Sequence, residues 1–327
     1  MDRFRLNWSE MKKSYLVPIL LAALAISAPA QKSPYAGRWD LTVTPQTGNP
    51  YPQWMEITEK DGRLEGRFQP RGGAWRPLVS AKVDNAHLLL TLAEASARGP
   101  ATTWDFTAAG DKLTGVEKHG ETAGPQIAGV RAPELKRPMP KAWTTPVAIF
   151  NGKDLTGWEP IGNVQNNKWV ARDGELVNDN PVVEGSHGPG AANIKTTQKW
   201  QDFKLHFEVN CPEHGNSGFY LRGRYEIQIG TEGGTQPTHE MGAVYSHFAS
   251  AGNIGNKLGE WTSFDVTFVG RYATVIRDGV KIHDNVEIPG PTGGALDSNE
   301  SEPGSFFLQG DHQGVIRYRN ITISVPK

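Results

Sequence analysis

The sequence predicts an all-β protein, in which a small β-barrel or sandwich domain precedes a larger jelly-roll sandwich. The 327-residue chain is only 37% hydrophobic and carries 37 glycines and 23 prolines, a composition typical of many short strands joined by turns. Short segments of alternating apolar and polar residues recur along the chain, whereas helical spacing is hardly found. This length fits one large or two medium domains.

Residues 1–30 have the features of a bacterial export signal. Two lysines precede the apolar run 15–26, and Ala-Pro-Ala at 28–30 supplies the small residues of a cleavage site. The run is too short to span a bilayer comfortably, and the cleavage site lacks the cysteine of a lipid anchor. We therefore expect a periplasmic or secreted protein with no membrane span after cleavage. Its single cysteine, Cys211, excludes an intrachain disulfide.

Residues 31–131 are predicted to form a small all-β accessory domain. The predicted strands are 37–44, 53–58, 63–69, 75–83, 87–92, 102–107 and 112–119. Their spacing suits an up-and-down barrel or a sandwich. This part shows no cluster of titratable groups typical of a reaction centre, so we expect a binding or spacer module. Core packing is favoured over a ligand pocket for Trp54, Trp75 and Trp104.

Residues 132–146 form the clearest domain boundary. Four prolines in this segment remove backbone donors and favour extended chain, which predicts a linker. Beyond it, residues 147–327 again contain short alternating segments, and Asp-Gly pairs at 173–174 and 278–279 mark hairpin turns. Antiparallel strands joined by long loops predict a two-sheet sandwich of the jelly-roll type.

Residues 214–230 combine a tight polar turn with strict alternation. A strand over 218–230 would have one buried face. The other face is unusual, because Arg, Glu, Gln and Tyr bind sugars and move protons; a solvated face with an incidental salt bridge is an equal alternative. The apolar side holds Phe219, Leu221, Gly223, Tyr225, Ile227 and Ile229, and the polar side holds Tyr220, Arg222, Arg224, Glu226 and Gln228.

Short motifs stand out in order along residues 147–327. They are FNGKDLTGW at 150–158, GNSGFYLRG at 215–223, YEIQI at 225–229, GAVY at 242–245, LQGDH at 308–312 and RNI at 319–321. Together they resemble the 3-keto-disaccharide hydrolase domain family, long known only as a domain of unknown function. The resemblance implies a concanavalin A-like sandwich, the fold of many lectins and glucanases, and action on glycosides oxidised at carbon 3.

A 3-keto glycoside can be cleaved without the paired carboxylates of common glycosidases. The ketone acidifies the proton on carbon 2; removal of that proton gives an enolate that expels the group on carbon 1, and water can add later. Such a site needs a base near carbon 2, donors at the ketone oxygen and an acid at the leaving oxygen. The resemblance therefore implies a carbohydrate-active enzyme that acts by elimination or net hydrolysis.

Glu226 is the preferred catalytic base, because a strand interior fixes a side chain better than a loop does. Arg222 and Gln228 share its predicted face, although Arg222 and Glu226 could simply pair with each other. Asp311 and His312 follow a predicted strand and form a candidate proton relay or metal-ligand pair, with a capped turn as the alternative. The candidates for substrate binding are Arg222, Gln228, Arg319, Glu208, Asn216 and Tyr220.

The sequence also limits partners and cofactors. A net charge of −1 gives no electrostatic case for nucleic acid or an anionic membrane. No histidine pair has zinc-protease spacing, so a divalent cation such as calcium would need ligands that only the fold brings together, and no metal ligand is assigned. The expected partner is a 3-keto glycoside or another carbohydrate.

Two other functions fit a lectin-like sandwich. A carbohydrate-binding protein without catalysis suits the ten tryptophans, but lectins rely more often on Asn, Asp and aromatic stacking than on Arg, Glu and Gln. An ordinary endoglucanase would carry Glu-x-Asp-x-x-Glu on one strand, whereas residues 226–231 offer one carboxylate. We therefore expect the keto-sugar enzyme, with the binding protein as the alternative.

Overall fold

The computed structural model describes residues 33–182, 190–230, 236–252 and 254–327, and residues 33–327 form one compact unit. The predicted export signal lies outside the described residues. The described chain is built from strands and has only two three-residue 3-10 turns, at Val164–Asn166 and Pro237–His239, so the predicted all-β class is confirmed. None of the described helical turns is long and apolar enough to cross a membrane.

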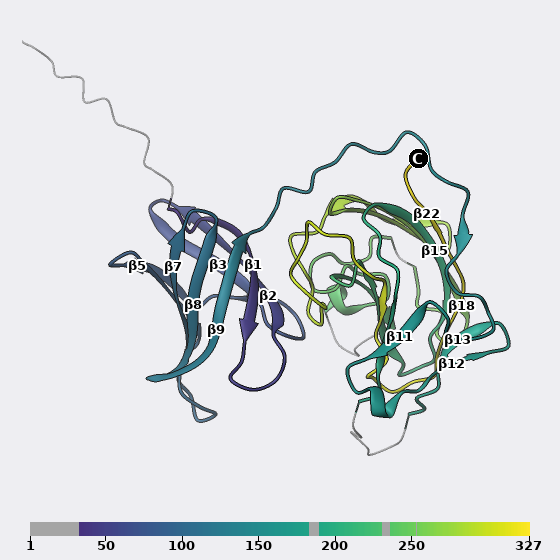
Figure 1. Ribbon diagram of the computed structural model, residues 1–327, viewed down its shortest axis with the longest axis horizontal. Coiled ribbons are helices and arrows are strands. Elements are labelled where there is room, and N and C mark those ends of the chain that lie inside the picture. Colours follow the sequence, from purple (N-terminus) through teal and green to yellow (C-terminus); the bar gives the residue numbers. More distant parts are fainter. Residues whose placement is uncertain (1–32, 183–189, 231–235, 253) are drawn as a thin grey trace, which may run out of the picture. The chain divides into compact units, whose positions relative to one another are not determined.

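Residues 37–131 fold into one antiparallel sheet that curls on itself (Figure 1). The strand order is β2-β1-β9-β8-β7-β6-β5-β3-β4, and β2 also pairs with β3, which closes the sheet into a barrel. Closure pairs strands that would otherwise be exposed edges. The strands are β1 (Gly37–Thr44), β2 (Tyr51–Lys60), β3 (Arg63–Gln69), β4 (Arg76–Pro77), β5 (Ser80–Asp84), β6 (His87–Ala93), β7 (Thr102–Ala109), β8 (Lys112–His119) and β9 (Thr122–Arg131).

Prolines account for two differences from the predicted strands of the barrel. Strand β9 was not predicted, yet it pairs with both β1 and β8 and so completes the closure. Pro125 cannot donate to a ladder, and the β8–β9 register shifts between Val116 and Lys118, beside this proline. The predicted strand 75–83 is instead two short strands, because β4 ends at Pro77.

The three tryptophans considered for the barrel core have different places. Trp104 belongs to the core and packs edge-on against Phe68, with 5.4 Å between ring centroids. Trp54 is fully buried, but its ring lies outside that core and edge-on to His247 at 6.0 Å. Trp75 is half-buried and follows the barrel strand β3. Burial by packing is therefore confirmed for Trp104 and Trp54, although only Trp104 belongs to the barrel core.

The predicted linker, residues 132–146, contains no helix or strand apart from an isolated bridge at its residue Trp143. Its prolines cannot donate backbone hydrogen bonds, which keeps the segment extended. Side chains from later in the chain nevertheless hold it. Pro133 O accepts a hydrogen bond from Arg271 Nη2, and Arg137 forms an ion pair with Asp202 at 3.1 Å.

Residues 147–327 fold into two antiparallel sheets. The larger has the order β12-β13-β22-β15-β18-β19-β20, with β10 also paired to β22, and the smaller has the order β11-β14-β21-β16-β17. Neighbouring strands are often far apart in the sequence, as in jelly-roll sandwiches. The strands are β10 (Val147–Ala148), β11 (Trp158–Ile161), β12 (Trp169–Arg172), β13 (Glu175–Asn178), β14 (Asn193–Thr196), β15 (Phe203–Asn210), β16 (Asn216–Leu221), β17 (Tyr225–Gly230), β18 (Trp261–Val269), β19 (Tyr272–Arg277), β20 (Val280–Glu287), β21 (Phe307–Leu308) and β22 (Ile316–Ser324).

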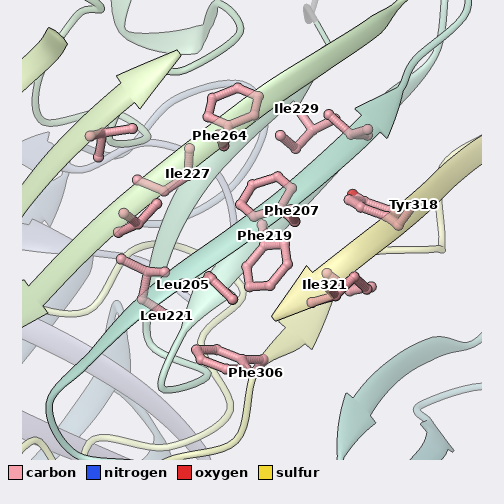
Figure 2. Packing of buried hydrophobic residues seen from close by; sticks show 14 of the residues in the cluster. Leu205, Phe207, Phe219, Leu221, Ile227, Ile229, Phe264, Phe306, Tyr318 and Ile321 are labelled. Atoms are coloured by element: carbon pink, nitrogen blue, oxygen red, sulfur yellow. The ribbon is translucent and has the colours of Figure 1, made fainter. Parts of the chain in front are cut away.

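The core of this sandwich is filled by aromatic rings from both sheets. Phe207 of β15 stacks on Phe219 of β16 at 4.3 Å and on Phe264 of β18 at 5.0 Å between centroids (Figure 2). Ile227 and Ile229 of β17 enter the same cluster. Because side chains alternate along a strand, the opposite face of β16 and β17 is the face that carries their polar residues.

The predicted strand 218–230 is divided into β16 and β17 by a three-residue turn. Arg222 and Gly223 both have positive φ, 53° and 68°, in this turn, and Leu221 pairs with Tyr225 across it. Glycine adopts such φ values easily, which favours a hairpin at this point. The alternation of residue types continues through the turn, so it did not show that the chain reverses there.

Candidate active site

A cavity of about 570 Å³ lies over the polar face of the β16–β17 hairpin. This volume suits a sugar-sized ligand, because small-molecule sites usually measure about 300–1,000 Å³. The hairpin contributes Tyr220 and Glu226, since alternation sends their neighbours into the core. The lining residues are Arg71, Gly72, Gly73, Tyr220, Glu226, Tyr245, Gly293, Gly294, Gln309, Asp311 and His312.

Glu226 is a deeply buried acid of this lining, only 3% exposed. The ladder register places it opposite Tyr220, whose hydroxyl donates to Glu226 Oε2 at 2.7 Å. Its backbone N–H donates to Thr292 Oγ1 at 3.0 Å, and its carbonyl accepts from Tyr245 N at 3.0 Å. Gly218 leaves room for the carboxylate, which a Cβ at that position would touch. The position of Glu226 is thus fixed on several sides.

The Tyr220 hydroxyl lies between two acceptors. It is 2.7 Å from Glu226 Oε2 and also 2.7 Å from Gly293 O. Burial, and then the charge of Glu226, raise the pKa of Tyr220 well above its ordinary value, so the hydroxyl keeps its proton. The single hydroxyl proton can therefore be donated to either acceptor. Which acceptor receives it depends on whether Glu226 is itself protonated.

Asp311 and His312 line the same cavity, and their side chains are about half exposed, 44% and 46%. The carboxylate and the imidazole are 3.9 Å apart, measured from Asp311 Oδ1 to His312 Nε2. Their backbone is held by two asparagines. Asn193 Oδ1 accepts from Asp311 N at 3.2 Å, and Asn180 Nδ2 donates to His312 O at 2.8 Å. The structure therefore brings both residues to the cavity of Glu226.

Asn216 and Gln228 share the polar face of the hairpin but do not line the cavity. Gln228 is 1% exposed, and its Nε2 donates to Asn216 Oδ1 at 2.8 Å. The backbone of Gln228 also bonds to Gly242 and Ala243, so the segment after β17 folds back against this strand. Both side chains support the hairpin beside the site.

The prediction that Arg222 shares a face with Glu226 is wrong. Because Arg222 lies in the turn, its side chain leaves the alternation of the strand. The guanidinium is 1% exposed and lies over the rings of Tyr225 and Phe268, at 5.4 and 5.2 Å from their centroids. Its Nη2 donates to Tyr225 OH at 3.1 Å. Arg222 therefore belongs to the interior of the sandwich.

Glu208 and Arg319 do not lie with Glu226, contrary to the prediction. They face each other on β15 and β22 of the larger sheet, where Arg319 Nε donates to Glu208 Oε2 at 2.6 Å. Arg319 also lies over the Trp261 ring at 3.9 Å. Burial raises the pKa of Glu208, but hydrogen bonds from Asn320 and Arg319 outweigh it, and the pKa is lowered overall. This pair is an ion pair outside the cavity lining.

Several lining residues were not among the predicted site residues. Tyr245 and Gln309 lie in the GAVY and LQGDH motifs, so the resemblance contained a signal for them. Tyr245 stacks on His239, with 4.7 Å between ring centroids. Arg71 and Gly293 belong to loops that no motif or alternation marked. Their place in the site follows from tertiary contacts alone.

A metal site is not apparent in the described residues, where no group of three or more His, Cys, Asp or Glu side chains could hold an ion. The carboxylates of the cavity lining, Glu226 and Asp311, come from different strands and loops. What this arrangement offers chemically is a buried acid–phenol pair beside a more exposed carboxylate and imidazole. Such a set can accept one proton and supply another.

Comparisons with solved structures found similar chains. Two proteins of Parabacteroides distasonis, named as candidate glycosyl hydrolases, align with 28% and 21% identity, cover 58% and 54% of this chain and 93% and 92% of their own, and give TM-scores of 0.44 and 0.43. A non-specific endo-beta-1,3(4)-glucanase of family GH16 aligns with 9% identity, over 58% of this chain and 94% of its own, with a TM-score of 0.36. No curated protein matches the sequence.

The family described as the 3-keto-alpha-glucoside-1,2-lyase-like domain matches residues 145–324. This match covers more than half of the chain and includes both sheets of the sandwich. It confirms the resemblance seen in the motifs of residues 147–327. The barrel strands lie outside the match. The chain belongs to the family of 3-keto-alpha-glucoside-1,2-lyase-like domains.

Proposed function

We propose that this glycoside-hydrolase-type enzyme cleaves glycosides oxidised at carbon 3, by removing the proton on carbon 2 and expelling the group on carbon 1. One observation carries the proposal: the buried carboxylate of Glu226, hydrogen-bonded to Tyr220, lines a cavity of a size that suits a sugar. The family is named for this substrate class and for a lyase reaction. The chain's own residues offer a base and a source of protons for such a reaction.

Glu226 is the proposed base. When it takes the carbon 2 proton, the C–H electron pair forms an enolate with the carbon 3 ketone. Tyr220 then stabilises the proton on the Glu226 carboxyl group. Before the transfer its hydroxyl donates to Glu226; afterwards it can accept from the protonated acid and donate to Gly293 O. This change of direction stabilises both protonation states without moving a heavy atom.

Asp311 and His312 are the proposed source of the second proton. The enolate expels the carbon 1 oxygen as the C–O bond breaks, and that oxygen must gain a proton to leave as an alcohol. A half-exposed imidazole beside a carboxylate can donate such a proton and recover it from solvent. Water that adds to the resulting double bond completes a net hydrolysis; without this addition the reaction ends as an elimination.

The test is product analysis with a 3-keto-disaccharide and its unoxidised parent. We expect cleavage of the keto form alone. Glu226→Gln should lower kcat by roughly 10²–10⁴-fold, the usual contribution of a positioned base. Glu208→Gln, which changes a half-buried carboxylate of the larger sheet, serves as the matched control and should keep full activity. If wild type leaves the keto form intact, or if Glu226→Gln matches wild type, the proposal is wrong.

A reaction run in deuterium oxide tests whether the proton on carbon 2 is removed. If that proton is removed and water adds later, the released sugar carries deuterium at carbon 2. Direct displacement by water at carbon 1 would leave the original hydrogen in place. Tight binding of an intact sugar without any conversion would instead favour a carbohydrate-binding protein.

Export of the enzyme is a further part of the proposal. It rests on the sequence features of residues 1–30. Expression in a bacterial host should yield a mature protein whose N-terminal sequence begins near Gln31. Recovery of the uncleaved chain from the cytoplasm would contradict it.

A further inference from the structure

Arg71 contributes to the wall of the Glu226 cavity, although it lies far outside the family match. It belongs to the loop 70–75, which joins barrel strands β3 and β4. Together with Gly72 and Gly73, it is part of the lining. The loop also bonds directly to another lining segment, since Gly294 N donates to Arg71 O at 3.1 Å. The barrel thus provides part of a cavity whose acids lie on the sandwich.

The loop is fixed from within the barrel. Gln69 is 2% exposed, and its Nε2 donates to Gly73 O at 2.6 Å and to Pro70 O at 3.2 Å. Gly293 approaches so closely that a Cβ there would collide with Gly73 O and lie 2.8 Å from Gly73 N. This close backbone contact requires glycine at 293. The carbonyl of the same Gly293 accepts from Tyr220. The loop therefore packs directly behind the acid–phenol pair.

A second contact anchors the other end of the loop. Trp75 N donates to Ser246 Oγ at 3.0 Å, and Trp75 Nε1 donates to Ser246 O at 2.8 Å. Ser246 directly follows Tyr245, which lines the cavity. The loop is thus held by Gln69 of the barrel and, at its other end, by Ser246 next to the site, and this reduces the backbone entropy lost when Arg71 binds a ligand.

The Arg71 side chain is an exposed cation on the cavity wall. Its guanidinium lies over the Tyr51 ring, 4.8 Å from the centroid, and this contact orients the planar group. Among the described residues it forms no ion pair, whereas Arg67 on the preceding strand pairs with Glu56 at 2.8 Å. An oriented guanidinium without a carboxylate partner offers two parallel donors to a pair of adjacent oxygen acceptors.

We propose that Arg71 is a specificity-determining residue that binds the aglycone, the part of the substrate beyond the oxidised ring. The aglycone would present two neighbouring oxygens, either vicinal hydroxyls of a second sugar or a uronic acid carboxylate. This inference rests on the proposed function. It assigns the barrel a role in substrate selection, which goes beyond the binding or spacer role expected from its sequence.

The test compares substrates with and without those oxygens, using the full-length protein. The aglycones are a neutral sugar, a uronic acid and a methyl group, each on the same 3-keto ring. Arg71→Ala should raise KM roughly 5- to 30-fold for the neutral sugar and the uronic acid, with little change in kcat. The reason is that the alanine variant lacks the hydrogen bonds that the charged guanidinium donates to the bound aglycone. The methyl glycoside should be unaffected. A larger loss for the uronic acid would identify the carboxylate as the preferred acceptor.

Two further variants separate binding from folding. Arg71→Lys keeps the charge and should recover part of the affinity, and Arg76→Ala removes an exposed arginine of β4 that does not line the cavity. Arg71→Ala and these two variants should all have the wild-type melting temperature. The proposal would be overturned if Arg71→Ala left KM at the wild-type value for all three aglycones. It would also be overturned if Arg71→Ala raised KM equally for all three, the methyl glycoside included.

A binding measurement keeps this inference distinct from the proposed reaction. If wild type turns over none of the three glycosides, their dissociation constants are measured by calorimetry for wild type and Arg71→Ala. Tenfold weaker binding of the two oxygen-bearing aglycones in Arg71→Ala would support the aglycone site although the proposed reaction fails. Equal binding by both proteins, or binding by neither, would refute it.

Discussion

Gly218 is the position at which one added carbon should disturb the site most selectively. A Cβ at this residue would lie 2.8 Å from Glu226 Cδ and 2.9 Å from Glu226 Cγ. The backbone of Gly218 does not have the positive φ that disfavours other residues. Gly218→Ala therefore adds a steric contact against the carboxylate and little backbone strain.

The magnitude follows from these distances. Non-bonded carbon atoms prefer a separation of about 3.5–4.0 Å, so the carboxylate would have to retreat by about 0.6–1.2 Å. A shift of this size costs on the order of 100-fold in rate when it affects a catalytic group. The displaced atoms are the end of a flexible side chain, so we expect a stability cost of only about 1–3 kcal/mol.

The assay measures kcat, KM and melting temperature of Gly218→Ala with a 3-keto-disaccharide. We expect kcat to fall about 100-fold, KM to change less, and the melting temperature to fall by a few degrees. Gly255→Ala is the matched control, because a Cβ at Gly255 meets nothing within 4 Å. Wild-type kcat in a folded Gly218→Ala protein would refute the assigned position of the base.

Two other predictions concern the buried polar groups around the site. Tyr220→Phe removes the donor shared by Glu226 and Gly293 O, so we expect the free energy of unfolding in urea to fall by about 1–3 kcal/mol and kcat to fall as well. Unchanged values would show that the hydroxyl contributes neither to stability nor to catalysis. The second concerns His247, whose ring nitrogens are buried without partners among the described residues. Burial, then nearby Arg67 and Arg38, lower the pKa of His247 to about 3. The unfolded chain therefore takes up the proton first, so this contribution to stability is complete above about pH 6.5 and is lost as pH falls toward 3. Urea midpoints between pH 8 and 4 should decline more steeply for wild type than for His247→Phe, and parallel curves would contradict this.

The alternation along residues 214–230 correctly predicted which residues face the core. Phe219, Ile227 and Ile229 all enter the aromatic cluster, and Glu226 lies on the opposite face. Side-chain direction in a strand depends only on neighbouring residues, so a local pattern is enough to predict it. The same pattern failed at Arg222, because a turn with positive φ interrupts the period without changing the sequence of residue types.

The shape of the barrel was less predictable. The sequence left a barrel and a sandwich open, and the closing strand β9, which contains Pro125, was not predicted. Closure depends on pairing between β2 and β3 at one side and between β9 and both β1 and β8 at the other. Such pairing is a property of the whole sheet, so a proline tolerated at one irregular position does not exclude a strand.

The resemblance likewise identified motifs without saying which of them meet. It brought Glu226, Asp311 and His312 forward as candidates, and these residues line one cavity. Arg319 of the RNI motif was a candidate as well, but it pairs on the larger sheet with Glu208, a candidate that lies in no motif. A motif records that residues occur together in a family, but it does not record which sheet carries them.

By itself, the sequence determined the all-β class and the apolar faces of the strands, because these properties depend on local period and composition. Its motifs, through their resemblance to a known family, also identified the family of residues 145–324. The tertiary structure alone decided which polar residues share the cavity. Tyr220 and Glu226 meet through a hairpin register, whereas Asp311 and Arg71 reach them from distant parts of the chain. Such contacts form only when sheets close and loops pack against each other, and no period in the sequence encodes them.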